Sequence, residues 1–316
     1  MPDSGIVRTR HAVEVAADPK AVYGLIAAAE GWPYVFPPTV HVERLDGDSR
    51  TERLKIWAFA NGEVRSWTSR RELDAAALRV TFHQEVSSAP VASMGGEWIV
   101  EAAPGGASVV LLHDFSVVDD DPAAREWVRR AVDTNSGAEL AALKSAAESL
   151  GAEPRALLSF ADHVDVAGPA EAVYDFLWRA DLWEERLPHV SRLVLTTPGD
   201  GLQTVEMDTR SADDSVHTTK SVRVGFGPDR LVYKQTVVPP LMSAHTGRWV
   251  VEPTGDGVRV SSHHTVVLRT DRVRELLGAD ATLDTARDLV RAALGRNSSA
   301  TLTLAKQAAE QAAAER

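Results

Sequence analysis

The chain repeats itself at a spacing of 151 residues, and this repeat limits the folds that it can adopt. The tryptophans at 98 and 249 define the shift, and the same shift holds without a gap from residue 13 to residue 113. It aligns Val13 with Val164, Tyr23 with Tyr174, Trp32 with Trp183, Pro37 with Pro188, Gln84 with Gln235, Glu101 with Glu252, Gly106 with Gly257 and His113 with His264. Chance does not hold one register over such a length, so the chain is predicted to contain two homologous domains, 1–151 and 152–316.

The last helix of each copy aligns at a larger shift of 162 residues. The matched residues are Ala131, Asn135, Ser136, Ala138, Lys144 and Glu148 in the first copy and Ala293, Asn297, Ser298, Ala300, Lys306 and Glu310 in the second. The difference between 162 and 151 is 11, so the second copy is expected to carry an insertion of 11 residues between its last strand and its last helix.

Composition excludes several classes of protein. Hydrophobic residues make up 44% and charged residues 25% of the 316 residues, which is typical of globular domains. No apolar run is long enough for a membrane span and residues 1–10 lack the apolar centre of a signal peptide, so we expect no membrane association and a cytoplasmic location. The net charge of -11 argues against nucleic acid as a partner. The absence of cysteine excludes disulfides and thiolate nucleophiles.

The first copy reads as one strand, two short helices, six strands and one long helix. The expected strands cover 11–16, 39–45, 53–59, 63–73, 78–86, 95–102 and 108–118, and the expected helices cover 18–29, a turn near 35–36, and 121–150. The fold class is therefore α+β, with a seven-stranded, mostly antiparallel sheet beside one long helix.

The long helix leaves two interpretations open. Ala131, Asn135, Ala138 and Ala142 fall on one helical face, where small side chains leave room for a cavity if the sheet curls around the helix. Alternatively, the alanine face packs flat on the sheet with no cavity.

The strand at 63–73 carries the most suggestive side chains. An Asn61-Gly62 turn is expected to precede it, and alternation then places Trp67, Ser69 and Arg71 on the face that also carries Leu73. Such a face is typical of a pocket wall. An amphipathic strand with solvated arginines is the alternative.

The order of elements and motifs resembles the aromatase/cyclases of bacterial type II polyketide synthases, which have the START-like helix-grip fold. The duplicated arrangement resembles the didomain members of that family. The motifs that carry the resemblance are Trp32-Pro33 with Phe36, Asn61-Gly62 before Trp67, Ser69 and Arg71, Ala89-Pro90 before Met94 and Trp98, His113-Asp114-Phe115, and Asn135.

The resemblance implies cyclisation and dehydrative aromatisation of the first ring of a poly-β-ketone. The chain would be held on an acyl carrier protein, made by a minimal polyketide synthase and, for the didomain members, reduced by a ketoreductase. This chemistry implies no cofactor and no metal, and it needs groups that fold the chain, stabilise enolates and move protons. A non-catalytic carrier of hydrophobic ligands and a chaperone for a reactive chain are the alternatives, since the fold alone does not fix the function.

The resemblance assigns roles in the first domain. Arg71 is the expected enolate-binding group, with Ser69 and His113 as the other catalytic candidates; Ser69 can instead bond to backbone, and His113 can be structural. The expected substrate-binding residues are Trp67, Trp32, Phe36, Thr39, Met94, Trp98 and Asn135. Thr39 stands where the family has a tyrosine, which leaves the general acid unassigned.

The second copy is expected to differ at these positions. The shift of 151 carries Trp67 to Thr218, Ser69 to Lys220 and Arg71 to Val222, so the arginine site is absent in this alignment. The chemistry is therefore expected mainly in the first domain. The second domain is expected to be structural or to hold a modified pocket with Lys220, His245, His264 and Asn297.

Overall fold

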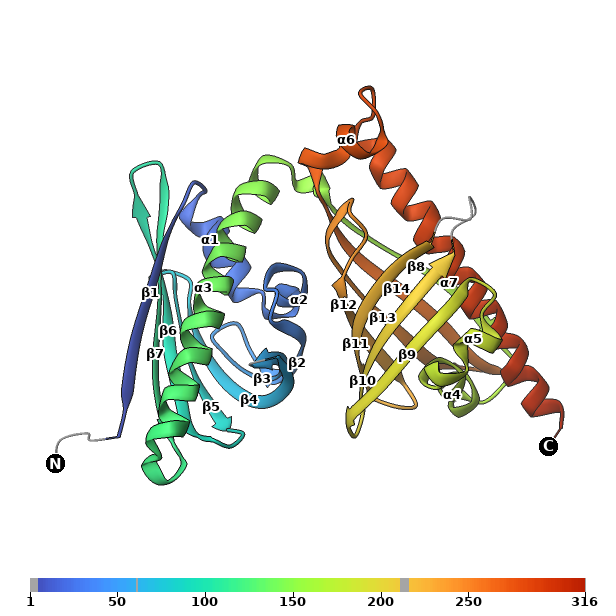
Figure 1. The fold of residues 1–316 in the computed structure, drawn as a ribbon, viewed down its shortest axis with the longest axis horizontal. Coiled ribbons are helices and arrows are strands. Elements are labelled where there is room, and N and C mark those ends of the chain that lie inside the picture. The colour runs from blue at the N-terminus through green and yellow to red at the C-terminus, as the bar shows by residue number, and fades with distance from the viewer. Residues whose placement is uncertain (1–4, 61, 211–215, 316) are drawn as a thin grey trace. The chain divides into compact units, whose positions relative to one another are not determined.

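The computed structural model describes residues 5–60, 62–210 and 216–315, and the chain divides into two compact units, Met1–Pro154 and Arg155–Arg316. Each unit is a seven-stranded antiparallel sheet with a long helix along one face (Figure 1), which confirms the predicted fold class. Asn61 of the predicted Asn61-Gly62 turn lies outside the described residues. Within the described ranges, no helix has the length and apolar character that a membrane span requires.

The first unit follows the predicted order of elements, with somewhat longer strands. Its strands are β1 (Val7–Val15), β2 (Thr39–Gly47), β3 (Thr51–Ala60), β4 (Glu63–Asp74), β5 (Arg79–Val86), β6 (Val91–Ala103) and β7 (Gly106–Val117). Its helices are α1 (Pro19–Ala27), α2 (Trp32–Val35) and α3 (Pro122–Ala152), with 3-10 turns η1 (Ala29–Gly31) and η2 (Val118–Asp120).

The second unit repeats this order. After η3 (Pro154–Ala156), its strands are β8 (Leu157–Val166), β9 (Val190–Gly199), β10 (Leu202–Arg210), β11 (Val216–Gly225), β12 (Arg230–Val237), β13 (Met242–Thr254) and β14 (Gly257–Leu268). Its helices are α4 (Ala170–Trp178), α5 (Trp183–Arg186), α6 (Val273–Leu277) and α7 (Leu283–Ala314), with 3-10 turns η4 (Ala180–Leu182) and η5 (Thr270–Arg272).

Strand order in both sheets places the first strand beside the last. The orders are β1-β7-β6-β5-β4-β3-β2 and β8-β14-β13-β12-β11-β10-β9. Alternation decides which face is covered: Leu54, Ile56 and Ala58 of β3 are buried, whereas the residues between them are partly exposed. The long helices pack on the two neighbouring strands, α3 on β1 and β7, and α7 on β8 and β14. Each sheet therefore encloses an interior against its own helix.

Sequence signals set the starts of the helices. Asp18 accepts hydrogen bonds from the backbone N–H of Lys20 and Ala21, and Pro19 occupies the first turn of α1. Asp121 and Pro122 do the same for α3, whereas α7 begins with a capping box between Thr282 and Thr285.

The insertion predicted in the second copy forms η5 and α6. In the first unit β7 ends at Val117 and α3 begins at Pro122, but in the second unit β14 ends at Leu268 and α7 begins only at Leu283. The extra segment packs on the start of α7 through Val273 and Leu277. It therefore adds a wall at one end of the second interior.

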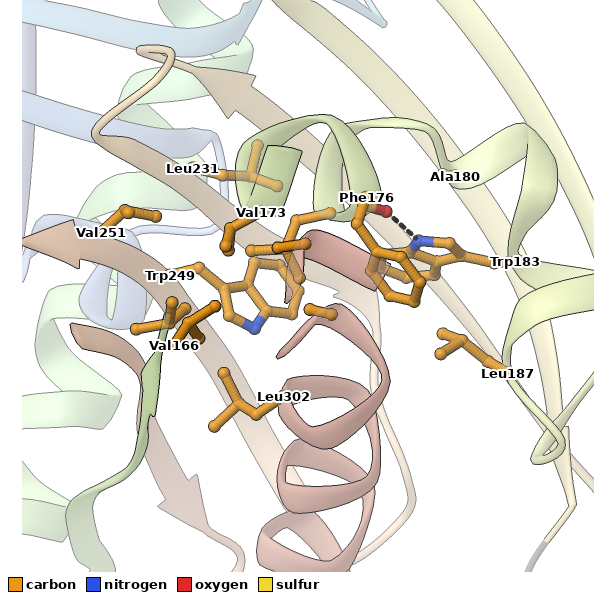
Figure 2. Close-up of a cluster of buried hydrophobic side chains, with 14 of the residues drawn as sticks. Val166, Val173, Phe176, Ala180, Trp183, Leu187, Leu231, Trp249, Val251 and Leu302 are labelled. Atoms are coloured by element: carbon orange, nitrogen blue, oxygen red, sulfur yellow. Dashed lines mark hydrogen bonds between the residues drawn. The ribbon is translucent and has the colours of Figure 1, made fainter. Parts of the chain in front are cut away.

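Two tryptophans lie within the mostly aliphatic core of the second unit (Figure 2). The indole N–H of Trp183 donates to the carbonyl of Phe176, 3.2 Å away, and Trp183 meets Trp249 edge to face with ring centroids 6.2 Å apart. The equivalent Trp32 donates to the carbonyl of Ile26 at 3.0 Å. An indole with a satisfied N–H, buried at Trp183 and partly buried at Trp32, thus lies against the first helices of each unit.

One strand departs from the 151-residue register. Glu52 pairs across β3 and β4 with Arg71, and Gln203 pairs across β10 and β11 with Arg223. Glu52 and Gln203 differ by 151 positions but the two arginines by 152, so the β10–β11 hairpin contains one additional residue. Because side chains alternate between faces, this extra residue exchanges the two faces of β11 relative to the ungapped alignment.

Candidate functional site

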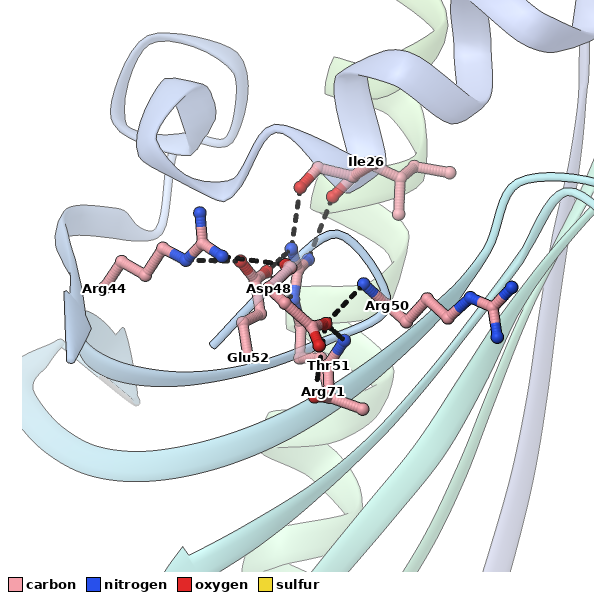
Figure 3. Close-up of polar contacts among 8 residues, drawn as sticks. Ile26, Arg44, Asp48, Arg50, Thr51, Glu52 and Arg71 are labelled. Atoms are coloured by element: carbon pink, nitrogen blue, oxygen red, sulfur yellow. Dashed lines mark hydrogen bonds and ion pairs between the residues drawn. The ribbon is translucent and has the colours of Figure 1, made fainter. Parts of the chain in front are cut away.

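Arg71 is buried in the first unit, and its donors are occupied by protein groups (Figure 3). Its Nε–H donates to Glu52 Oε1 at 2.8 Å, Nη1 donates to the Ile26 carbonyl at 3.0 Å, and Nη2 donates to the Ala27 carbonyl at 2.7 Å and also to Glu52. The guanidinium carbon lies 4.8 Å from the ring centroid of Trp32. The charge of Arg71 is thus balanced by Glu52, and the pair ties β3 and β4 to the end of α1.

Arg223 occupies the same place in the second unit, but without a carboxylate. It donates to the carbonyl of Leu177 and, at 2.8 Å, to the amide oxygen of Gln203, and its guanidinium carbon lies 4.7 Å from the Trp183 ring centroid. Among the described residues, no carboxylate forms an ion pair with Arg223 and its Nε has no hydrogen-bond partner. Burial lowers the pKa of Arg223 to about 9. The guanidinium is therefore a buried cation whose charge has no such balance.

This equivalence corrects the expectation that the second domain lacks the arginine site. Ser69 and Arg71 correspond to Ser221 and Arg223, because Ser221 pairs with Val205 as Ser69 pairs with Leu54. Lys220 was expected to face a pocket, but its side chain is 46% exposed and lies 3.6 Å from Glu206. The one-residue insertion turns Lys220 to the outer face of the sheet.

A cavity of about 560 Å³ lies inside the second unit. Its wall includes Arg223 and Ser221 from β11 and Asn297 from α7, and it continues to Leu276 and Leu277 of α6. A space of this volume suits a ligand of drug-like size.

Two histidines, a tyrosine and a serine form a hydrogen-bonded cluster in the wall of this cavity. The Nδ1 atom of His264 lies 2.9 Å from Nε2 of His245 and 3.1 Å from the hydroxyl oxygen of Tyr233. Its Nε2 atom lies 2.5 Å from Ser298 Oγ. Burial lowers the pKa of His264 to about 4 and lowers the pKa of His245 well below its ordinary value. Both imidazoles are therefore neutral at pH 7.

A glycine makes room for Tyr233 to reach this cluster. Tyr233 on β12 pairs with Gly247 on β13, which pairs in turn with His264 on β14. A Cβ atom at position 247 would overlap the phenol ring and hydroxyl of Tyr233. The absence of a side chain at Gly247 thus lets the ring cross β13 and place its hydroxyl beside His264.

The first unit has the same row of residues with fewer polar groups. Phe82 replaces Tyr233, Gly96 replaces Gly247 and His113 replaces His264. His113 meets Phe82 edge to face at 5.4 Å, its Nδ1 has no hydrogen-bond partner among the described residues, and burial lowers its pKa to about 4. Met94 stands at the position of His245, so the paired imidazoles of the second unit have no counterpart.

The other residues predicted for the first domain lie on the inner side of its sheet and helices. Ser69 donates to the His83 carbonyl at 3.0 Å, and the amide nitrogen of Asn135 donates to the Phe59 carbonyl at 3.2 Å. Both side chains thus make the backbone contacts that the sequence left open. The aromatic and apolar residues pack in cores. Phe36 lies beside Trp32 and Trp98, and Trp67 packs against the cluster that contains Leu54 and Ile56. Met94 packs against the cluster that contains Phe115, and Thr39 is buried.

Several site residues escaped the sequence analysis. Arg223 and Ser221 were hidden by the ungapped alignment, although Thr219, Ser221 and Arg223 repeat the alternation of Trp67, Ser69 and Arg71. Tyr233 gave a usable signal, because it aligns with Phe82 and differs from it by one hydroxyl group. Glu139 of α3, one turn after Asn135, also drew no attention in the sequence, and burial raises its pKa to about 7.

Fold and geometry together define a class: a tandem helix-grip protein whose second unit has a cavity lined by a buried arginine and a cluster of histidine, tyrosine and serine side chains. Comparison with known proteins is consistent with that class. Both copies match the protein family described as "Polyketide cyclase / dehydrase and lipid transport", over residues 7–148 and 158–310. The chain belongs to this family.

Relatives match along nearly the whole chain. The granaticin polyketide synthase bifunctional cyclase/dehydratase of Streptomyces violaceoruber is 44% identical over 314 residues, which are 99% of this chain and 97% of that protein. The actinorhodin polyketide synthase bifunctional cyclase/dehydratase of Streptomyces coelicolor is 43% identical over 319 residues, covering 98% of this chain and 99% of that protein.

Two crystal structures of di-domain ARO/CYC proteins also match. BexL has a TM-score of 0.87 at 51% identity, covering 96% of this chain and 99% of that chain. StfQ, from the steffimycin biosynthetic pathway, has a TM-score of 0.81 at 32% identity, covering 98% of this chain and 99% of that chain.

Proposed function

We propose that the cavity of the second unit is the place where this chain, a polyketide aromatase/cyclase, carries out its chemistry. The observation that carries the proposal is the exchange of Glu52 for Gln203 beside the equivalent arginines. The exchange removes the carboxylate that balances Arg71 and leaves the charge of Arg223 available to a ligand in the cavity.

A buried arginine of this kind suits the electrostatics of ring closure. Removing a proton from carbon next to a carbonyl group places negative charge on the carbonyl oxygen. A cation fixed in a poorly hydrated cavity stabilises that oxygen more strongly than it would in water. The unpaired Nε–H of Arg223 is the donor that we assign to the enolate oxygen. Ser221, on the same face, supplies a second polar contact.

The polar side chains of the cavity favour a catalytic function over the transport of hydrophobic ligands. A carrier of hydrophobic ligands needs an aliphatic wall, whereas this wall includes Arg223, Tyr233, His245 and His264. Among the described residues, buried polar atoms of Arg223, His245 and Gln235 lack hydrogen-bond partners. Buried polar atoms are costly unless something pairs with them, and a polyketide offers carbonyl and hydroxyl groups for that purpose.

The substrate that we propose is a poly-β-ketone bound to an acyl carrier protein and already reduced by a ketoreductase. The named relatives are parts of polyketide synthases, which supports work alongside a minimal synthase. Arg296 of α7 lines the cavity and is exposed, so it offers a positive charge to the acidic carrier protein. The exposed leucines Leu276 and Leu289 give the cavity wall an apolar rim for the chain.

The proposal moves the main site from the first unit to the second. Arg71 then serves to hold β3 and β4 against α1, and Ser69 and His113 shape the first interior. This differs from the role that the family resemblance assigns to Arg71, Ser69 and His113, and the experiment below separates the two assignments.

The test exchanges the partner of each arginine and leaves the arginine in place. Gln203→Glu should neutralise Arg223 and lower aromatised product about a hundredfold, whereas Glu52→Gln should leave product formation unchanged. Each variant copies a residue that the other unit already accommodates, so both should fold. The assay is reconstitution with a minimal synthase, carrier protein and ketoreductase, with products identified by mass and NMR. Loss of product in Glu52→Gln alone would return the chemistry to the first unit.

A further inference from the structure

Tyr233 differs from its counterpart Phe82 by the hydroxyl group that reaches the histidine pair. The hydroxyl oxygen lies 3.1 Å from Nδ1 of His264 and 3.5 Å from Nε2 of His245. Tyr233 also pairs across the sheet with Arg223 and lines the cavity. A proton donor and a fixed cation thus stand on neighbouring strands and face the same space.

We propose that Tyr233 is the proton donor that converts the departing hydroxyl group of the cyclised polyketide into water, while the His245–His264 pair holds the proton in transit. The inference rests on the proposed function, because it places the dehydration in the cavity that contains Arg223. It assigns a catalytic role to the hydroxyl that distinguishes the second unit from the first.

The proposed dehydration conserves every proton and electron pair of the substrate and the protein. The neutral imidazole pair accepts a proton from the carbon next to a carbonyl group; the electron pair of that C–H bond forms a carbon–carbon double bond, and the π pair of the carbonyl group moves to its oxygen beside Arg223. The C–O bond of the hydroxyl on the next carbon then breaks, and the enolate electrons form a carbon–carbon double bond. Tyr233 gives its proton to the leaving oxygen, and the imidazole pair returns its proton to the phenol oxygen. One water molecule is released and the protein returns to its starting state.

The contacts of the cluster support these roles. Burial raises the pKa of Tyr233, so the phenol keeps its proton until a strong base, the leaving hydroxide, forms beside it. The 2.9 Å separation of His264 Nδ1 and His245 Nε2 lets one added proton be shared between two rings. Ser298, at 2.5 Å from Nε2 of His264, fixes the orientation of that ring.

The first unit shows which side chains the same fold accepts at the positions of this cluster. There the aligned positions carry Phe82, Met94 and Leu111 in place of Tyr233, His245 and Ser262. A phenylalanine therefore fits over the glycine of this row without loss of the fold. The replacement Tyr233→Phe should likewise leave the second unit folded, so a loss of activity would report the hydroxyl group.

The experiment compares Tyr233→Phe with Arg223→Gln in the reconstituted synthase described above. Tyr233→Phe should accumulate a cyclised product heavier by one water, with dehydration slowed by about a hundredfold or more, because general acids contribute on that scale. Arg223→Gln should reduce formation of both the hydrated and the aromatised product. Phe82→Tyr is the matched control in the first unit and should leave the product profile unchanged.

The results for the two variants distinguish the role of Tyr233 from the placement of the chemistry in the second unit. Aromatised product at the normal rate from Tyr233→Phe, together with an inactive Arg223→Gln, would overturn the role of Tyr233 alone. Normal product from both variants would overturn the placement of the chemistry in the second unit. If Tyr233→Phe fails to fold, fluorinated tyrosine at position 233 is the alternative, because it keeps the hydroxyl group and changes its acidity. A dehydration rate that follows this acidity supports Tyr233 as the proton donor. An unchanged dehydration rate overturns that assignment.

Discussion

Arg71 and Arg223 make equivalent contacts with the first helix of their own unit, but only Arg71 meets a carboxylate. Arg71 donates to the carbonyls of Ile26 and Ala27, and Arg223 donates to the carbonyl of Leu177. The anchor is therefore common to both copies, whereas the balance of charge is not. A buried pair of opposite charges ties the strands of the first unit to its first helix, whereas the buried charge of Arg223 has no carboxylate partner among the described residues.

Removing Arg71 should destabilise the first unit strongly. Arg71→Met leaves the buried Glu52 with only the longer ion pair to Arg44, at 3.5 Å, and leaves two carbonyls without donors, which should cost about 3–5 kcal/mol in the free energy of unfolding. Chemical denaturation followed by tryptophan fluorescence measures this loss. Arg70→Met is the control, since Arg70 is an exposed neighbour on the same strand, and it should change stability by well under about 1 kcal/mol. Equal stability of the two variants would contradict the anchoring role.

Gly247→Ala should displace Tyr233 and lower stability by about 1–3 kcal/mol, because the new Cβ would overlap the phenol ring. The double variant Gly247→Ala/Tyr233→Ala removes the ring as well, so its loss should be smaller than the sum of the two single losses. Gly255→Ala is the control, since no atom lies within 4 Å of a Cβ built there. Strict additivity in thermal or chemical denaturation would show that the ring does not depend on this glycine.

Stability should fall on acidification through the buried histidines. His113 and His264 have folded pKa values of about 4, below the ordinary 6.5, so their contribution is complete above pH 6.5 and is lost as the pH falls toward 4. Each contributes on the order of 3 kcal/mol over that interval. Denaturation curves between pH 8 and pH 4 measure most of the loss, because this range starts above the ordinary histidine pKa and ends at the folded pKa.

Glu139 should act in the opposite direction. Its pKa is raised by burial from 4.5 to about 7, so its stabilising contribution is present at low pH and is lost as the pH rises through 7. Glu139→Gln removes that opposing contribution, and the fall of stability on acidification should become steeper. An unchanged slope would show that Glu139 keeps an ordinary pKa in the folded protein.

The inserted helix α6 should help to bind the polyketide. Leu276 lines the cavity yet is 37% exposed, so Leu276→Ala should weaken binding of an aromatic product by about three- to tenfold with little change in stability. Binding is measured by quenching of tryptophan fluorescence. Leu45→Ala is the control, because Leu45 is an exposed residue of the first unit. Equal binding by both variants would exclude α6 from the ligand site.

Much of the fold could be predicted from the sequence, because its signals are local. Alternating strands, the Asp-Pro starts of the helices and the internal repeat each depend on neighbouring residues or on one spacing. The insertion of α6 was visible as the difference between two shifts. His245, His264 and Asn297, which the sequence analysis expects in a second-domain pocket, lie in the wall of the cavity.

The remaining errors have two physical causes. A single extra residue in the β10–β11 hairpin reverses the two faces of β11, so an ungapped alignment exchanges Arg223 for Val222 and Ser221 for Lys220. The sequence also could not show that Glu52 neutralises Arg71, because the two residues meet only across a pair of strands. The charge balance of a site depends on such pairs, and alternation alone does not identify them.

The glycine that both units have beside Phe82 or Tyr233 bears on how the two copies diverged after the duplication. Gly96 and Gly247 both leave space for an aromatic ring, so the ancestral domain could already accept either phenylalanine or tyrosine at the neighbouring strand. Phenylalanine and tyrosine codons differ at one nucleotide. A single point mutation in one copy could therefore separate the chemistry of the two halves, while the other copy kept the scaffold intact.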